Sequence, residues 1–201
     1  MTVAILRAFI VLLLFLSYSS FTPTASLAQD SQNIQLSAVT QSGGKPLLTT
    51  LAERKSTRSF KPDPISDKQL SELLWAAVGI TRPDGKRTIP TARGQNEIEV
   101  YAVLPTGVYH YNPEKNILEL VLAGNFSKEY GNSYITLLFA APNNVMGGLH
   151  AGSAYQNTGL YCASEGLANV VKISGTDALK GKLSLPNNYE ILVVQSIGIP
   201  G

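Results

Sequence analysis

The chain has 201 residues, of which 44% are hydrophobic and 15% are charged, and its formal net charge is +2. This composition excludes a disordered or fibrous chain and predicts one globular domain with a substantial core. The charges are nearly balanced and form no long basic run, so a nucleic-acid partner is not expected.

Residues 1–28 are expected to be a secretory signal peptide. Arg7 supplies the positively charged n-region, an apolar run of about nine residues follows, and small residues precede a cleavage site at Gln29. The run is too short to span a bilayer, which needs roughly 20 apolar residues. Cleavage removes one cation and lowers the formal charge to +1. We therefore expect an exported protein, periplasmic or extracellular, without a stable membrane span; an uncleaved anchor is the alternative.

Residues 29–45 are polar, contain glycine and show little periodicity, so they are expected to form a linker. The folded domain is expected to comprise residues 46–201. The leucines of residues 47–52 fall at helical spacing and predict a short helix. A longer helix is predicted to begin at Ser66, because Gln69 three residues later completes a capping box, and to end at Gly79.

The second half of the domain carries mostly strand patterns. They occur at residues 98–104, 107–111, 117–122, 134–142, 168–174 and 190–200. Residues 112–116 between the second and third predict a hairpin, whose strands must be antiparallel. Helices are expected at residues 150–167 and, shorter, at 176–184. Together these elements predict an α+β fold with a mixed, mainly antiparallel sheet flanked by helices.

The chain lacks the usual catalytic and metal motifs. The single cysteine, Cys162, excludes an intramolecular disulfide and is expected to be a small buried thiol. His110 and His150 are the only histidines, and no metal site is expected from two distant histidines. His110 is interpreted as a cross-strand packing residue. No Walker loop, dinucleotide fingerprint or nucleophile elbow occurs.

The segment ERKSTRSF, residues 53–60, has the densest cluster of cations and hydroxyls. Arginine can bind two phosphate oxygens at once, and a serine hydroxyl can donate another hydrogen bond. In an extended chain Arg54, Ser56 and Arg58 would point to the same side. Spacing alone does not decide between a phosphate site and a solvated loop, and both interpretations remain open at this point.

The order of segments resembles the nitroreductase family of flavoproteins, in particular its short branch with the thiazoline and oxazoline oxidases. The likeness begins with R-x-S-x-R-x-F and S-x-x-Q-L-x-x-L-L-W-A-A, and continues through YQNTGLYCASEGLANVV to VVQSIGIP. It extends from about Pro46 to Pro200, which is essentially the whole predicted domain.

The resemblance implies an FMN bound between the two subunits of a homodimer. By this analogy Arg54 and Ser56 contact the phosphate and ribityl end, and Arg58 lies near the pyrimidine edge, where a cation stabilises the reduced flavin. Ser174 and Gly175 match the backbone segment that faces the reactive ring nitrogen. The implied cofactor-binding residues are Arg54, Lys55, Ser56, Arg58, Thr91, Gln95, Asn96, Ser174 and Gly175.

The sequence departs from the family pattern at two places. Gly94 stands where the family has an amide side chain, so Gln95, Asn96 or the backbone is expected to meet the ring edge instead. Many members carry further basic residues after the last strand, which are not present here. Phosphate affinity is therefore expected to depend heavily on Arg54 and Arg58, together with Lys172.

The resemblance implies an exported FMN-dependent oxidoreductase. NAD(P)H or another donor would reduce the flavin, and a small organic acceptor such as a nitroaromatic compound, quinone or enone would take the electrons. The flavin does this chemistry, so no catalytic side chain is expected. The alternative is a catalytically degenerate exported domain of the same fold, with a flavin-binding or structural role.

Overall fold

The computed structural model describes residues 32–201, so the predicted signal peptide lies outside the described residues. The helices are α2 (Leu47–Glu53), α3 (Asp67–Val78) and α4 (Val145–Glu165), with short 3-10 turns η1 (Ala92–Gly94) and η2 (Ser127–Tyr130). The strands are β1 (Ile34–Gln35), β2 (Glu99–Leu104), β3 (Gly107–Asn112), β4 (Ile117–Ala123), β5 (Ile135–Pro142), β6 (Ala168–Lys172) and β7 (Tyr189–Gly198). Within residues 32–201, no helix is long and apolar enough to cross a membrane.

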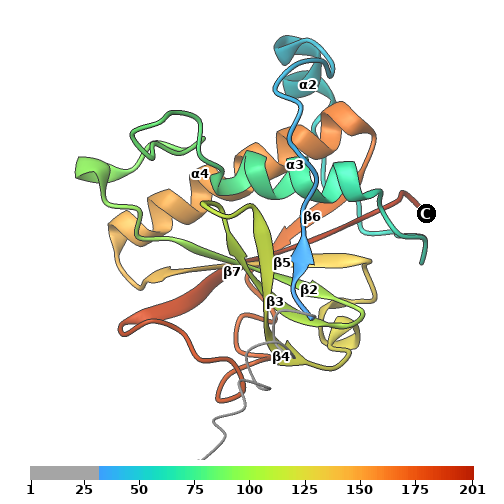
Figure 1. Cartoon of the computed structure of the whole chain (residues 1–201). Helices are drawn as coiled ribbons and strands as arrows, with labels where there is room; N and C mark the ends of the chain where they lie inside the picture. The colour runs from blue at the N-terminus through green and yellow to red at the C-terminus, as the bar shows by residue number, and fades with distance from the viewer. Residues whose placement is uncertain (1–31) are drawn as a thin grey trace, which may run out of the picture.

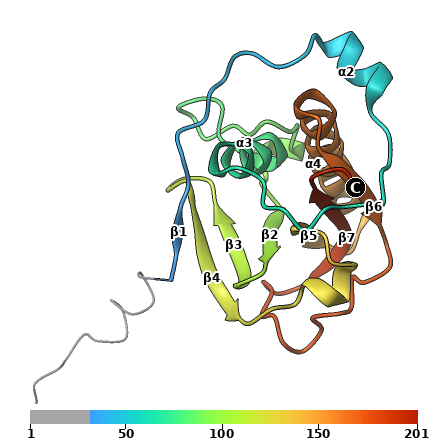
Figure 2. The same ribbon diagram turned by 90° about the vertical axis from the view of Figure 1, so that its right-hand side faces the viewer.

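The strands form one sheet in the order β1-β4-β3-β2-β5-β7-β6. All the strand pairs within residues 32–201 are antiparallel, including the predicted β3–β4 hairpin. Figures 1 and 2 show α3 and α4 together on one face of this sheet. The predicted α+β class with a mainly antiparallel sheet is confirmed. Strand β6 is therefore an edge strand, and its outer side accepts a backbone hydrogen bond from Thr57 at Asn169.

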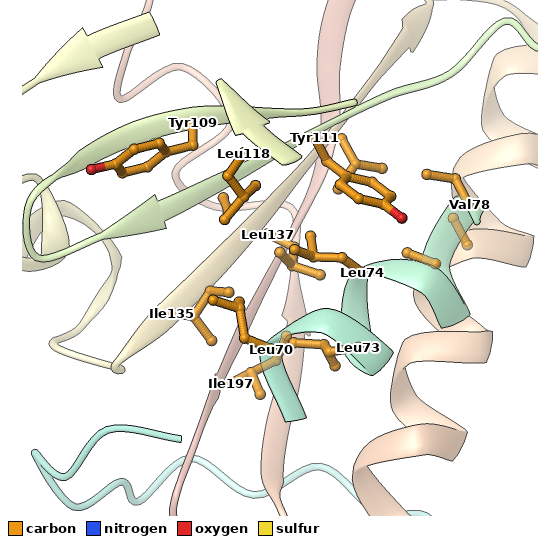
Figure 3. Close-up of a cluster of buried hydrophobic side chains, with 14 of the residues drawn as sticks. Leu70, Leu73, Leu74, Val78, Tyr109, Tyr111, Leu118, Ile135, Leu137 and Ile197 are labelled. Carbon is orange, nitrogen blue, oxygen red and sulfur yellow. The ribbon is translucent and has the colours of Figure 1, made fainter. Parts of the chain in front are cut away.

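Helix α3 forms as its sequence predicts and anchors the larger core. Ser66 accepts a hydrogen bond from the Gln69 amide (Oγ to N, 3.2 Å), and Gln69 accepts one from the Ser66 amide (Oε1 to N, 3.0 Å). These two bonds satisfy amides that the first turn leaves unpaired. Figure 3 shows the apolar face of α3 packed on the sheet, with Leu70, Leu73 and Leu74 near Ile135, Leu137 and Ile197.

The predicted helix at residues 176–184 is wrong. This segment consists of turns, in which the amides of Lys180 and Lys182 donate to carbonyls three residues earlier. Gly181 has φ +77°, a left-handed conformation that cannot continue an α-helix. Leu179 is nevertheless buried and joins a second apolar cluster, so the segment covers the sheet face opposite α3 and α4.

Part of the expected linker packs against the domain. Ile34 and Gln35 pair with β4, and Leu36 is buried in the larger core. The chain then crosses the helices, where the Ser37 amide donates to Ser71 Oγ (2.9 Å). A strand of two residues has no detectable alternation, so the sequence pattern could not reveal it.

Helix α4 begins earlier than the predicted residue 150. Asn144 caps it by accepting a hydrogen bond from the Gly147 amide (Oδ1 to N, 2.9 Å). A Cβ on Gly147 would lie 2.0 Å from the carbonyl oxygen of Pro142, so only glycine permits this close turn from β5 into α4. The pair Gly147 and Gly148 obscures this start in the sequence. The early start extends α4, which packs against β5, β6 and β7.

Candidate functional site

The basic segment after α2 is held in an extended conformation at the β6 edge of the sheet. The Thr57 amide donates to the Asn169 carbonyl (2.7 Å), and Phe60 pairs with Pro200 as an antiparallel bridge. The Lys61 amide donates to the Ile199 carbonyl (2.9 Å). The segment is therefore fixed between the start of β6 and the residues that follow β7.

Side chains alternate between the two sides of this segment. Lys55 and Thr57 line an open groove of about 690 Å³. Arg54 is not among the lining residues of that groove and lies against α4, with its Cδ 3.8 Å from the position that a Cβ on Gly159 would occupy. Ser56 and Arg58 are likewise not among the lining residues. The predicted grouping of Arg54, Ser56 and Arg58 thus agrees with the extended backbone.

The cations of this segment make no ion pair within residues 32–201. Arg54 is half-buried and Arg58 is exposed, and neither side chain forms a hydrogen bond there. The adjacent acid, Glu53, is instead paired with Lys45 (Nζ to Oε2, 2.6 Å). Lys45 therefore offsets the charge of Glu53, and neither arginine has an acidic partner within residues 32–201.

The predicted residues Thr91, Gln95 and Asn96 lie elsewhere in the same chain. Their segment joins α3 to β2, and the neighbouring Glu97 carbonyl lies 3.4 Å from His150 Nδ1 on α4. Arg54 lies beside the same helix at Gly159, nine residues further on, which corresponds to about 14 Å of helix. Figure 1 shows α2 and this segment near opposite ends of α4. A single chain therefore does not bring Thr91, Gln95 and Asn96 to Arg54.

Ser174 and Gly175 lie on the same sheet edge as Arg54 but farther along it. Ser174 is exposed in the turn just beyond β6, five residues after Asn169. Gly175 has φ +91°, and a Cβ there would lie 3.5 Å from the Tyr130 ring. The β6 edge of one chain thus carries both Arg54 and the predicted ring residues Ser174 and Gly175.

A buried amide pair beside Arg54 was not predicted from the sequence. Gln195 of β7 donates from Nε2 to Oδ1 of Asn169 on β6 (3.1 Å), and both residues are buried. The available signal was an amide residue next to apolar residues in each of two strands, at "ANVV" and "VVQSIG". Such residues in a core usually serve a specific hydrogen-bonding purpose.

Comparison with known proteins identifies the family to which this fold and segment belong. The model described as Nitroreductase family matches residues 51–146. A candidate nitroreductase of Ralstonia eutropha JMP134, known from its crystal structure, is 35% identical. The alignment covers 84% of this chain and 90% of that chain, with a TM-score of 0.78. The chain belongs to the nitroreductase family.

More distant relatives agree with this nitroreductase assignment. A candidate nitroreductase of Methanocaldococcus jannaschii is 28% identical over 118 residues, and the match spans 56% of this chain and only 58% of that relative. A nitroreductase of Bacteroides fragilis NCTC 9343 with bound FMN is 14% identical, with 78% of this chain and 89% of that chain covered and a TM-score of 0.57. The Escherichia coli microcin synthetase McbBCD complex, with truncated pro-MccB17 bound, is 22% identical, with 92% and 85% covered and a TM-score of 0.60. The last two establish the fold alone. The predicted family is confirmed.

Cys162 is fully buried in α4 of this nitroreductase-family chain. Burial raises the pKa of its thiol, because the thiolate would lose its hydration. The expected role as a small buried thiol is therefore confirmed, and a nucleophilic role is disfavoured.

His110 lies between two carboxylates on the sheet, away from the basic segment. Its Nε2 is 2.6 Å from Glu99 Oε2, and its Nδ1 is 3.7 Å from Glu119 Oε2. Its ring is also 5.2 Å from that of Tyr101, so the predicted cross-strand packing is present. The hydrogen bond to Glu99 raises the pKa of His110, and burial opposes this shift. Protonated His110 thus links β2, β3 and β4.

This arrangement predicts how stability depends on pH. Because the pKa of His110 is higher in the folded than in the unfolded chain, its contribution is full below the unfolded pKa of about 6.5. The contribution is lost as the pH rises through the folded pKa. The unfolding midpoint of the wild type should therefore fall, relative to that of His110→Gln, between about pH 6 and pH 8. If the unfolding midpoints of the two proteins differ by the same amount at every pH in this range, the assignment is contradicted.

Proposed function

We propose that this chain is an exported FMN-dependent oxidoreductase in which the segment Arg54–Arg58 binds the cofactor's phosphate. This proposal depends on one observation. Backbone hydrogen bonds hold the segment extended at the sheet edge, and its arginines have no partner within residues 32–201. The membership in the nitroreductase family supports an oxidoreductase, and a relative of the same fold holds FMN. The predicted signal at residues 1–28 supports a location outside the cytoplasm.

The residues of the segment fit a phosphorylated flavin. A guanidinium donates two parallel hydrogen bonds to phosphate oxygens, so Arg54 would bind the phosphate together with the hydroxyl of Ser56. Arg58 would lie towards the ring and stabilise negative charge there. Lys55 stands on the groove side of the segment, and we expect a weaker, longer-range contribution from its charge.

The flavin, when bound, supplies the hydride and electron transfer. This chain's own residues bind and orient the cofactor and hold cations near its anionic groups. NAD(P)H or another donor would deliver electrons. A small organic acceptor, such as a nitro compound, a quinone or an enone, would remove them.

The visible spectrum of the purified protein tests this function. We expect a yellow protein that loses its flavin absorption on anaerobic addition of NADH, or of dithionite if another donor serves. Arg54→Ala and Arg58→Ala should each weaken FMN binding by about tenfold or more, the size expected for a hydrogen bond to a charged group.

Lys61→Ala is the matched control, because Lys61 is an exposed cation of the same clamped segment outside the predicted site. Its flavin content should equal that of the wild type. A colourless wild type that takes up no added FMN would contradict the proposal and favour the degenerate, structural alternative. Wild-type flavin content in both arginine variants would contradict the assigned site.

We also propose a homodimer that completes this cofactor site. Two groups of exposed apolar residues lie at the two ends of α4: Leu47, Leu48 and Leu51 on α2, and Val145, Met146 and Leu149 at the start of α4. Large exposed apolar groups of this kind are typical of interfaces. In a two-fold dimer the α2 group of one copy can pack on the α4 group of its partner, and the α4 group on the partner's α2 group. That arrangement would place residues 91–96 of one copy near Arg54 of the other.

A single surface charge tests this dimer. Leu48 is 79% exposed, so Leu48→Lys should leave the fold intact. The buried lysine would disfavour the interface, so light scattering should show a monomer, and the monomer should retain less FMN. Val121→Lys is the control, because Val121 is an exposed apolar residue on β4, 45% exposed and away from both groups. A monomeric wild type with fully bound FMN would contradict the shared site.

A further inference from the structure

The amide pair of Asn169 and Gln195 contains a hydrogen-bond acceptor without a donor. Gln195 is fully buried, and its Nε2 donates to Asn169 Oδ1 (3.1 Å). Its Oε1 has no hydrogen-bond partner among residues 32–201. Buried polar atoms without a partner are rare in folded proteins, and each calls for a functional or structural explanation.

Arg54 brings unused hydrogen-bond donors close to this amide pair. The position of a Cβ on Gly159 would lie 3.6 Å from Asn169 Oδ1, 3.7 Å from Gln195 Nε2 and 3.8 Å from Arg54 Cδ. These three side chains therefore meet at one point beside α4, where Gly159 contributes no side chain. The guanidinium of Arg54 begins one bond beyond Cδ and is within reach of the Gln195 amide. It has five N–H donors.

We propose that Gln195 is a positioning residue for the cofactor: when the terminal bonds of Arg54 rotate, its guanidinium reaches the unpaired Oε1 of Gln195, which accepts a hydrogen bond and fixes the orientation of the other N–H groups towards the phosphate. The role towards FMN rests on the proposed function. Asn169 sets this geometry twice, because its side chain holds the Gln195 amide and its backbone carbonyl accepts the Thr57 amide (2.7 Å).

The chemistry of the acceptor suits an anion-binding arginine. An amide oxygen orients a guanidinium but carries no charge, so Arg54 keeps its full positive charge for the phosphate. A carboxylate at the same place would orient Arg54 equally well but would neutralise it. A glutamine is therefore the side chain expected where an arginine must be both fixed and available.

A double-mutant cycle tests the inference. Gln195→Met removes the acceptor with little change in volume, and FMN affinity is measured by quenching of flavin fluorescence. In the wild-type background Gln195→Met should weaken FMN binding by about tenfold, the size expected for one hydrogen bond to a charged group. In the Arg54→Ala background the same change should alter affinity by less than about twofold, because the two residues act through one bond.

Ser196→Ala is the matched control. Ser196 is the next residue of β7, equally buried, and its Oγ donates to the Tyr130 carbonyl on the opposite face (3.1 Å). Its loss should lower the unfolding midpoint but leave FMN affinity unchanged. The inference is overturned if Gln195→Met leaves FMN affinity unchanged, or weakens it equally with and without Arg54.

The flavin-free protein separates this inference from the proposed function. If the wild type binds no FMN, the proposed function fails, and the unfolding midpoints then decide whether the bond between Arg54 and Gln195 exists. A loss of stability on Gln195→Met that largely disappears in the Arg54→Ala background supports the bond. Equal losses in both backgrounds overturn it.

Discussion

The backbone hydrogen bonds that join the Thr57–Lys61 stretch to β6 and to the end of β7 are the constraint on which the site depends. The bond from the Thr57 amide to the Asn169 carbonyl and the bridge between Phe60 and Pro200 keep the chain extended. An extended backbone alternates its side chains, so Arg54, Ser56 and Arg58 share one side. A helical continuation of α2 would have spread the same residues around its circumference.

The charges around this hydrogen-bonded stretch favour an external anion over an acidic partner within residues 32–201. Lys45 pairs with Glu53, the acid next to Arg54, and the buried residue that lies beside Arg54 is the neutral Gln195 rather than a carboxylate. The remaining predicted ring contacts, residues 91–96, lie near the other end of α4. If the proposed cofactor site uses residues from both ends, it needs a second copy of the chain, and cofactor binding would then depend on assembly.

Local signals predicted those parts of the fold that local interactions determine. The capping box of Ser66 and the leucine spacing of α3 gave the right helix, and strand alternation gave the hairpin. The sequence could not reveal β1, because two residues carry no period, or the turns at residues 176–184, where Gly181 adopts φ +77°. The basic segment was recognisable from charge and hydroxyl density alone. The role proposed for Gln195 was not, because it depends on the place where β6, β7 and α4 meet, which is a property of tertiary structure.

The most direct test of the central claim compares the affinity of the purified protein for FMN and for riboflavin, which lacks the phosphate, at low and at high salt. If the clamped arginines bind the phosphate, FMN should bind at least about tenfold more tightly at low salt, and the difference should shrink as salt screens the charges. Equal affinities for the two flavins, or a preference for FMN that salt leaves unchanged, would contradict the account.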